Sequence, residues 1–208
     1  MTGSDTSLEG AYALRTPADS QRLYKDWAET YDAGFATSHG YVYARRVAEA
    51  YLSEGGGGIV LDVGAGTGLV AEAMPGIEAD AIDISPEMLD VAGRKGLYRN
   101  RIVGDLTKPL DLPDRAYDGV VSAGTFTHGH VGPVCLPELM RVTRTGALFV
   151  VGINHAVFDE AGFGSAFADL VADGAVAPMK FIRVPFYEAS NHDHADDKGL
   201  IAIFSRLK

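Results

Sequence analysis

Hydrophobic residues recur every three to four positions in the first quarter of the chain, whereas from residue 59 onward they come in short continuous runs. The first spacing places apolar side chains on one face of a helix. Thr16 followed by Pro17 is typical of a helix start, and the same spacing returns over 41–54, ahead of four glycines at 55–58. The apolar face of the first helix is formed by Tyr24, Trp27, Ala28 and Tyr31. The first quarter therefore predicts two amphipathic helices.

The apolar runs after residue 59 alternate with helical segments, which is typical of parallel β-α-β units. The runs predict seven strands, at roughly 59–63, 79–84, 99–103, 117–123, 147–152, 181–187 and 200–205. Helices are expected at roughly 68–74, from Ser85 to Gly96, at 133–142 and at 164–172. The last two strands suit an antiparallel hairpin. We therefore predict an α/β fold with a doubly wound, mostly parallel sheet.

The chain length and the hydrophobic share indicate one folded domain with a short addition. The chain has 208 residues, of which 47% are hydrophobic and 22% charged, as in globular proteins. Residues 1–15 have no periodicity and are expected to be a flexible leader. We expect a helical cap over 16–54 and the main domain over 55–208.

The charge and the absence of long apolar runs restrict the partners. A net charge of -10 repels polyanions, so nucleic acid is not an expected partner. No apolar run approaches the roughly 20 residues that cross a bilayer, and the first residues lack the pattern of a secretory signal. We therefore expect a cytoplasmic protein that does not act at a membrane. A single cysteine, Cys135, excludes an internal disulfide and a cysteine metal cluster.

A glycine-rich turn follows the first predicted strand, at the sheet edge where ligands of such folds bind. Gly64, Gly66 and Gly68 alternate, with Ala65 after the first of them. A dinucleotide fingerprint has its third glycine one residue later, where this chain has Leu69. The spacing therefore favours a ligand other than a nicotinamide dinucleotide. A nicotinamide-dependent oxidoreductase and a tight turn without any ligand are the alternatives.

Three acids stand at the ends of successive strands. Asp62 lies in an apolar strand and needs a partner, either an ammonium of a ligand or a loop N–H or arginine of the chain. Asp83 ends the second strand, where an acid is placed to accept from both hydroxyls of a ribose. Asp105 follows the third strand and could accept from the amine of adenine while Leu106 packs on the ring. Asp105 could equally be a turn residue.

Four segments in this order resemble the motifs of the class I S-adenosylmethionine-dependent methyltransferases. They are Leu-Asp-Val-Gly-Ala-Gly-Thr-Gly at 61–68, Ala-Ile-Asp-Ile-Ser-Pro-Glu-Met-Leu at 81–89, Gly-Asp-Leu at 104–106 and Tyr-Asp-Gly-Val-Val-Ser-Ala at 117–123. The resemblance implies a Rossmann-like seven-stranded sheet with an antiparallel last strand, and S-adenosylmethionine as cofactor. The first helix is similar to that of small-molecule members, including the Williams-Beuren-region methyltransferase-like group.

The same resemblance implies which residues hold the cofactor. Asp83 would hold the ribose, and Asp105 with Leu106 would hold adenine. In the small-molecule members the first helix covers the cofactor, although this helix could also merely pack on the sheet. The expected cofactor contacts are Tyr24, Trp27, Tyr31, Asp62, Gly64, Ala65, Gly66, Gly68, Asp83, Ile84, Met88, Gly104, Asp105, Leu106, Ala123 and Gly124.

The methyl acceptor is less well defined by the sequence. Methyl transfer from a sulfonium depends mainly on alignment and desolvation, so a catalytic base is optional. His128 is the best-placed candidate base, with Phe126, His130 and His155 as further candidate acceptor contacts, although such histidines could simply line the site. No nearby acid pair suggests a metal. The chain lacks an Asn-Pro-Pro-Tyr motif and an inserted domain, so we expect a small-molecule acceptor.

Several questions stay open at this level. A module that binds S-adenosylmethionine without transferring its methyl group is the main alternative to an enzyme, and a site closed to any acceptor would favour it. The sequence does not choose among O, N, S and C methylation, and it leaves the oligomeric state undetermined.

Overall fold

The computed structural model describes residue 10 and residues 16–188 and 193–208, so the expected leader over 1–15 lies outside the described residues apart from Gly10. Seven strands form one sheet. They are β1 (Ile59–Val63), β2 (Glu78–Asp83), β3 (Arg101–Val103), β4 (Tyr117–Phe126), β5 (Thr143–Asn154), β6 (Lys180–Pro185) and β7 (Lys198–Ser205). The α-helices are α2 (Pro17–Trp27), α3 (Tyr43–Ser53), α4 (Leu69–Glu72), α5 (Pro86–Lys95), α6 (Leu136–Val142) and α7 (Phe163–Ala172).

The strand order is β3-β2-β1-β4-β5-β7-β6, with β1 at the point where the order reverses. The first five strands are parallel, and β7 runs antiparallel to both β5 and β6. The predicted α/β class, the seven strands and the final hairpin are confirmed. In open sheets of this kind, ligands bind at the carboxyl ends of the strands beside the reversal point. Here that point lies between β1 and β4.

Strands β4 and β5 are longer than their apolar runs predicted. β4 continues to Phe126, which pairs with Ile153 after a register shift, and β5 begins at Thr143, which pairs with Tyr117. Pairing with a partner strand extends a strand beyond its own apolar run, and that pairing depends on residues distant in sequence.

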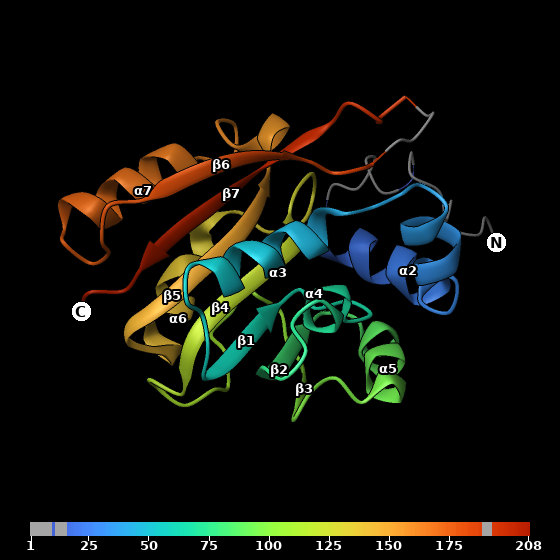
Figure 1. The fold of residues 1–208 in the computed structure, drawn as a ribbon, viewed down its shortest axis with the longest axis horizontal. Coiled ribbons are helices and arrows are strands. Elements are labelled where there is room, and N and C mark those ends of the chain that lie inside the picture. The colour runs from blue at the N-terminus through green and yellow to red at the C-terminus, as the bar shows by residue number, and fades with distance from the viewer. Residues whose placement is uncertain (1–9, 11–15, 189–192) are drawn as a thin grey trace.

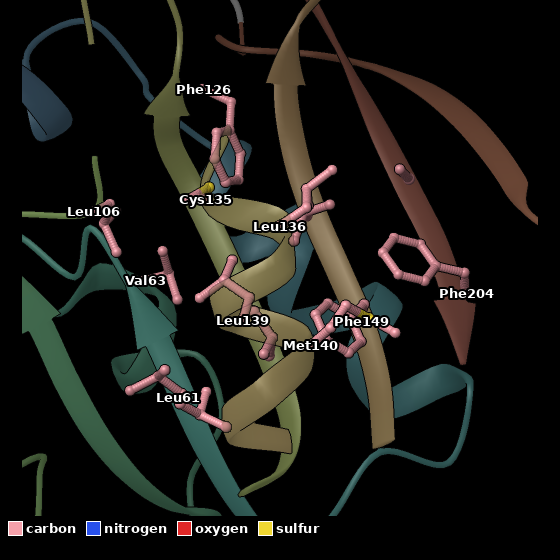
Figure 2. Close-up of a cluster of buried hydrophobic side chains, with 14 of the residues drawn as sticks. Leu61, Val63, Leu106, Phe126, Cys135, Leu136, Leu139, Met140, Phe149 and Phe204 are labelled. Atoms are coloured by element: carbon pink, nitrogen blue, oxygen red, sulfur yellow. The ribbon is translucent and has the colours of Figure 1, made fainter. Parts of the chain in front are cut away.

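Helices cover both faces of the sheet. On one face α3 packs against β4 and β5, and α5 packs against β2 and β3 (Figure 1). On the other face α6 and α7 enclose a second cluster of buried side chains. Figure 2 shows Leu136, Leu139 and Met140 of α6 lying among side chains from β1, β5 and β7. Cys135 is buried in the same cluster, so it serves there as a small core residue.

Helix α2 begins as predicted but ends earlier. The Thr16 hydroxyl accepts from the Asp19 N–H at 3.2 Å, and the Asp19 carboxylate accepts from the Thr16 N–H at 3.1 Å. This capping box fixes the start of the helix. The expectation that one helix extends through Tyr31 is wrong, because α2 ends at Trp27 and a π-helix covers Tyr31–Thr37.

The broken helix still gathers the predicted aromatic face. The ring centroids of Tyr24 and Trp27 are 6.2 Å apart, and those of Trp27 and Tyr31 are 5.2 Å apart. Figure 1 shows α2 beside α5, at the end of the molecule toward which the arrow of β1 points. Within the described residues, no helix combines the length and apolar content needed to cross a membrane.

Candidate functional site

The glycine turn after β1 depends on its missing side chains. Gly64 and Gly66 have φ of +65° and +54°, a region that favours glycine. The Gly64 N–H donates to the Ile82 carbonyl at 2.8 Å, which ties the turn to the end of β2. A Cβ at Gly64 would lie 1.9 Å from the Thr125 hydroxyl, whereas a Cβ at Gly66 would meet nothing within 4 Å. The turn is therefore packed on the β4 side and open at Gly66.

Asp83 closes the turn from the end of β2. Its buried carboxylate accepts from the Gly66 N–H at 2.8 Å and from the Ser85 N–H at 2.9 Å. Burial raises the pKa of Asp83, while these backbone hydrogen bonds oppose the shift. A carboxylate oxygen has more than one lone pair, so each oxygen can accept a further hydrogen bond from a ligand hydroxyl.

Asp62 lies beneath the turn and has a partner that the sequence analysis missed. Its Oδ2 accepts from the Tyr98 hydroxyl at 2.6 Å. Its Oδ1 is buried and has no hydrogen-bond partner among the described residues. Burial raises the pKa of Asp62 to about 7, although the Tyr98 hydrogen bond opposes this. Tyr98 is 36 residues downstream, and no spacing rule in the sequence connects the two side chains.

Asp105 adopts the turn alternative. Its Oδ1 accepts from the N–H of Thr107 at 2.9 Å and from the hydroxyl of Thr107 at 2.6 Å. Its Oδ2 pairs with the Lys108 ammonium at 2.9 Å. Asp105 nevertheless borders a cavity together with its neighbours Gly104 and Leu106.

That cavity, which we call the glycine-loop cavity, collects most of the residues predicted to hold a cofactor. No lysine or arginine is among the described residues that line it. The predicted cofactor contacts that line it are Tyr24, Tyr31, Gly64, Ala65, Gly66, Asp83, Ile84, Met88, Gly104, Asp105, Leu106, Ala123 and Gly124. His130, predicted as an acceptor contact, lines it as well. The lining that was not predicted comprises Tyr41, Ala44, Thr67, Leu69, Val70, Thr125 and Val131. Trp27, Asp62 and Gly68 do not line it.

The N-terminal segment is fastened over this cavity by polar contacts. Asp32 in the π-helix accepts from the Thr67 hydroxyl at 2.5 Å and pairs with the Lys95 ammonium at 2.5 Å. Glu29 pairs with Arg94 of α5 at 2.7 Å. Thr67 belongs to the glycine turn itself, so Asp32 links the covering segment directly to the cavity wall.

A second cavity, the aromatic pocket, adjoins the first. Nine of its thirteen lining residues are phenylalanine, tyrosine or tryptophan, and no aspartate, glutamate, lysine or arginine is among the described lining residues. They are Tyr24, Trp27, Tyr31, Phe35, Tyr41, Tyr43, Gly124, Phe126, Thr127, His130, Asn154, Phe186 and Tyr187. Five of these residues, Tyr24, Tyr31, Tyr41, Gly124 and His130, line both cavities. The two cavities therefore adjoin along these five residues.

One wall of the aromatic pocket depends on a contact between distant segments. An isolated antiparallel bridge pairs Tyr41 with Tyr187, and the Val42 N–H donates to the Phe186 carbonyl at 2.8 Å. The Tyr41 and Tyr187 rings lie 5.9 Å apart. Burial raises the pKa of the Tyr41 hydroxyl above its ordinary value, so that hydroxyl stays protonated at neutral pH. The predicted contacts Trp27 and Phe126 both line this pocket, although Trp27 was expected at the cofactor.

The three candidate histidines differ in position. His130 lines both cavities, whereas neither His128 nor His155 lines either of them. His155 is exposed, with its Nε2 3.0 Å from the Arg183 guanidinium. Of the candidate histidines, the structure therefore brings only His130 to the meeting point of the cavities.

The glycine turn and the strands around it match known proteins. Residues 61–151 match a family model described as a methyltransferase domain. The chain is 34% identical over 128 residues to malonyl-(acyl-carrier protein) O-methyltransferase of Serratia marcescens, a match that covers 59% of this chain and 48% of that protein. It is 35% identical over 102 residues to demethylmenaquinone methyltransferase of Renibacterium salmoninarum, covering 48% and 43%. Both matches span less than half of the relative's length.

Solved structures share the fold over nearly the whole chain. The 1,6-didemethyltoxoflavin-N1-methyltransferase of Burkholderia thailandensis, solved with bound 1,6-didemethyltoxoflavin and S-adenosylhomocysteine, superposes with a TM-score of 0.61 at 19% identity. The match covers 94% of this chain and 92% of that one. At this identity the likeness concerns the fold alone. The family match over residues 61–151 and the shared architecture agree: the chain is similar to methyltransferases in sequence and has the fold of solved S-adenosylmethionine-dependent methyltransferases.

Proposed function

We propose that this chain binds S-adenosylmethionine in the glycine-loop cavity and transfers its methyl group to a small molecule. The observation that carries the proposal is the cavity itself, in which the open face of Gly66 and the buried Asp83 carboxylate meet at the carboxyl ends of β1 and β2. Both residues are where the family resemblance and the parallel-sheet rule expect a nucleoside. The relatives named above act on small molecules or on an acyl group, which supports a small acceptor.

The residues of the cavity suit this cofactor. Asp83 would accept from the ribose hydroxyls, and Leu106 with Met88 would supply apolar contacts to the adenosine. Asp62 lies beneath the turn rather than in the lining, and its unpartnered Oδ1 would accept from the ammonium of the cofactor. A dinucleotide would bring a diphosphate to two lining carboxylates, Asp83 and Asp105, without a lining lysine or arginine to balance it. The lining therefore disfavours a nicotinamide cofactor.

When bound, the cofactor supplies an electrophilic methyl group on a positively charged sulfur. Rate in such a displacement comes mainly from holding the acceptor atom in line and from excluding water. The covering segment around Tyr24 and Tyr31, held down through Asp32 and Thr67, would provide that exclusion. The adjoining aromatic pocket gives an acceptor a place to bind, which disfavours the alternative of a module that only binds the cofactor.

Calorimetry with S-adenosylhomocysteine tests the proposal. Wild-type protein should bind it, and Asp83→Ala should weaken binding at least about tenfold, or about 1.4 kcal/mol. Asp83→Asn keeps an oxygen for the turn N–H and should weaken binding less. Asp90→Asn on the exposed side of α5 is the matched control and should bind like wild type. Absence of binding to folded wild-type protein would refute the cofactor assignment.

A further inference from the structure

His130 has a buried ring nitrogen at the place where the two cavities adjoin. Its Nδ1 lies 3.3 Å from the Gly124 carbonyl oxygen, which can only accept. The proton of the neutral ring therefore belongs on Nδ1, and Nε2 keeps a free lone pair. That Nε2 is buried and has no hydrogen-bond partner among the described residues. An unsatisfied buried acceptor is costly, so the site suits a ligand that donates to it.

The lone pair of His130 Nε2 lies where the two cavities adjoin. His130 and Gly124 line both cavities. A methyl donor bound in the glycine-loop cavity and a methyl acceptor bound in the aromatic pocket would therefore meet beside these two residues. The Tyr24 ring packs against the imidazole with its centroid 5.7 Å away, which restrains the orientation of the ring. The hydroxyls of Tyr24, Tyr31 and Tyr41 make no hydrogen bonds to described residues, and burial keeps each of them protonated.

The lining of the aromatic pocket restricts what can enter it. The pocket offers ring faces and edges from Trp27, Phe35 and Tyr187 and no ionised side chain among the described residues. Flat, neutral ring systems pack well against such surfaces. A carboxylate would be buried there without a cation, which is strongly unfavourable. An ammonium could contact ring faces but would find no carboxylate to pair with.

Building on the proposed function, we propose that the acceptor is a neutral, planar aromatic molecule whose hydroxyl group donates to His130 Nε2 in the aromatic pocket. The acceptor oxygen uses a lone pair to form the bond to the methyl carbon, and the electron pair of the broken carbon–sulfur bond remains on sulfur. The hydroxyl proton passes to Nε2, so the positive charge ends on the imidazolium, which then releases the proton to water.

The basicity of His130 is sufficient for this step. Burial lowers the pKa of His130 to about 4, with the Gly124 contact opposing and the neighbouring His128 adding to the shift. The imidazole is therefore neutral at physiological pH and ready to accept. An oxygen that bears both a methyl group and its original proton is far more acidic than such an imidazolium. The proton therefore moves downhill as the new bond forms, without prior ionisation of the hydroxyl.

Binding measurements test the proposal without any turnover. The protein saturated with S-adenosylhomocysteine would be titrated with 1-naphthol, 1-methoxynaphthalene, 1-naphthoate and 1-naphthylmethylammonium by calorimetry. Trp27 is the single tryptophan and lines the pocket, so quenching of its emission reports where the compound binds. We expect 1-naphthol to bind about tenfold more tightly than its methyl ether, and neither ion to bind measurably.

Matched variants assign the effect to His130. His130→Phe keeps a ring beside Tyr24 but removes the acceptor atom, so it should reduce the preference for 1-naphthol over its methyl ether to about one. His130→Gln offers an amide oxygen and should restore part of the preference. His194→Gln, in a turn outside both cavities, is the control.

The outcomes separate this inference from the proposed function. Preferred binding of either ion, failure of all four compounds to bind, or an unchanged preference in His130→Phe would each overturn the inference while S-adenosylhomocysteine binding stands. Loss of S-adenosylhomocysteine binding in wild-type protein would instead refute the proposed function.

Discussion

The glycine-loop cavity is built around a glycine turn at the carboxyl ends of β1, β2 and β4, whereas nine of the thirteen residues that line the aromatic pocket are aromatic. The first takes its shape from positive φ angles and N–H groups at Gly64 and Gly66. The second takes its shape from rings of the N-terminal quarter packed against Phe186 and Tyr187. We therefore expect the glycine-loop cavity to tolerate few changes in the glycine turn, and the aromatic pocket to be altered one ring at a time.

The largest effect that sharpens this comparison should come from a single added methyl group. Gly64→Ala would place its Cβ 1.9 Å from the Thr125 hydroxyl at a φ of +65°. We expect S-adenosylhomocysteine binding to fall more than about 100-fold and the free energy of unfolding to fall by about 2–3 kcal/mol. Calorimetry and urea unfolding measure the two quantities.

Gly57→Ala is the matched control for that change, because an added Cβ there meets nothing within 4 Å and Gly57 has no positive φ. It should bind and unfold like wild type. Equal behaviour of the two variants would show that the turn has room for a side chain at Gly64, contrary to its close packing against Thr125.

The next effect concerns the buried acid beneath the turn. Burial raises the pKa of Asp62 to about 7, so between about pH 4 and pH 7 the folded state holds this proton more tightly than the unfolded chain. The free energy of unfolding should therefore fall as pH rises through this window. Asp62→Asn removes the titration, and at pH 8 without cofactor it should be more stable than wild type by about 1–2 kcal/mol, a gain that disappears near pH 4.

Urea unfolding of both proteins from pH 4 to pH 8 measures this difference. Tyr98→Phe, which removes the hydrogen bond but keeps the acid, should retain the pH dependence and is the control. Parallel pH curves for wild type and Asp62→Asn would contradict the shifted titration.

The smallest effect concerns the link between the two cavities. Asp32→Ala removes the contacts to Thr67 and Lys95 that hold the covering segment on the glycine turn. We expect S-adenosylhomocysteine binding to weaken about threefold, since partly exposed polar contacts of this kind contribute little. Glu29→Ala removes a more exposed ion pair with Arg94 on the same segment and should leave binding unchanged. If the two variants behave alike, the covering segment is not coupled to the turn through Asp32.

Local sequence was enough to predict the parts of the molecule that local backbone chemistry governs. The start of α2 after Thr16, the start of α5 after Ser85 and its end at Gly96 follow from caps and prolines within a few residues. The strand that precedes the glycine turn has the predicted bounds, because a continuous apolar run between turn signals admits few other structures.

The end of α2 and the choice among the histidines depend on contacts between residues far apart in the sequence, and the sequence alone did not predict them. The end of α2 at Trp27 coincides with a π-helix whose Asp32 bonds to residues 35 and 63 positions away. Among the histidines, sequence favoured His128 because of its place after the fourth strand, whereas only His130 lines the cavities. Two residues so close in a loop differ in direction, and that direction is set by the packing of Tyr24 and the Gly124 carbonyl.

By itself, the sequence determined the seven-stranded α/β sheet and the cavity at the end of β1, because apolar runs, glycine spacing and strand-end acids act within short segments. Only the tertiary structure decided that a second, uncharged aromatic pocket adjoins this cavity and that the free nitrogen of His130 stands between them. The physical reason is that the pocket is assembled from rings at residues 24–43, 126 and 186–187, and no pattern along the chain records their meeting in space.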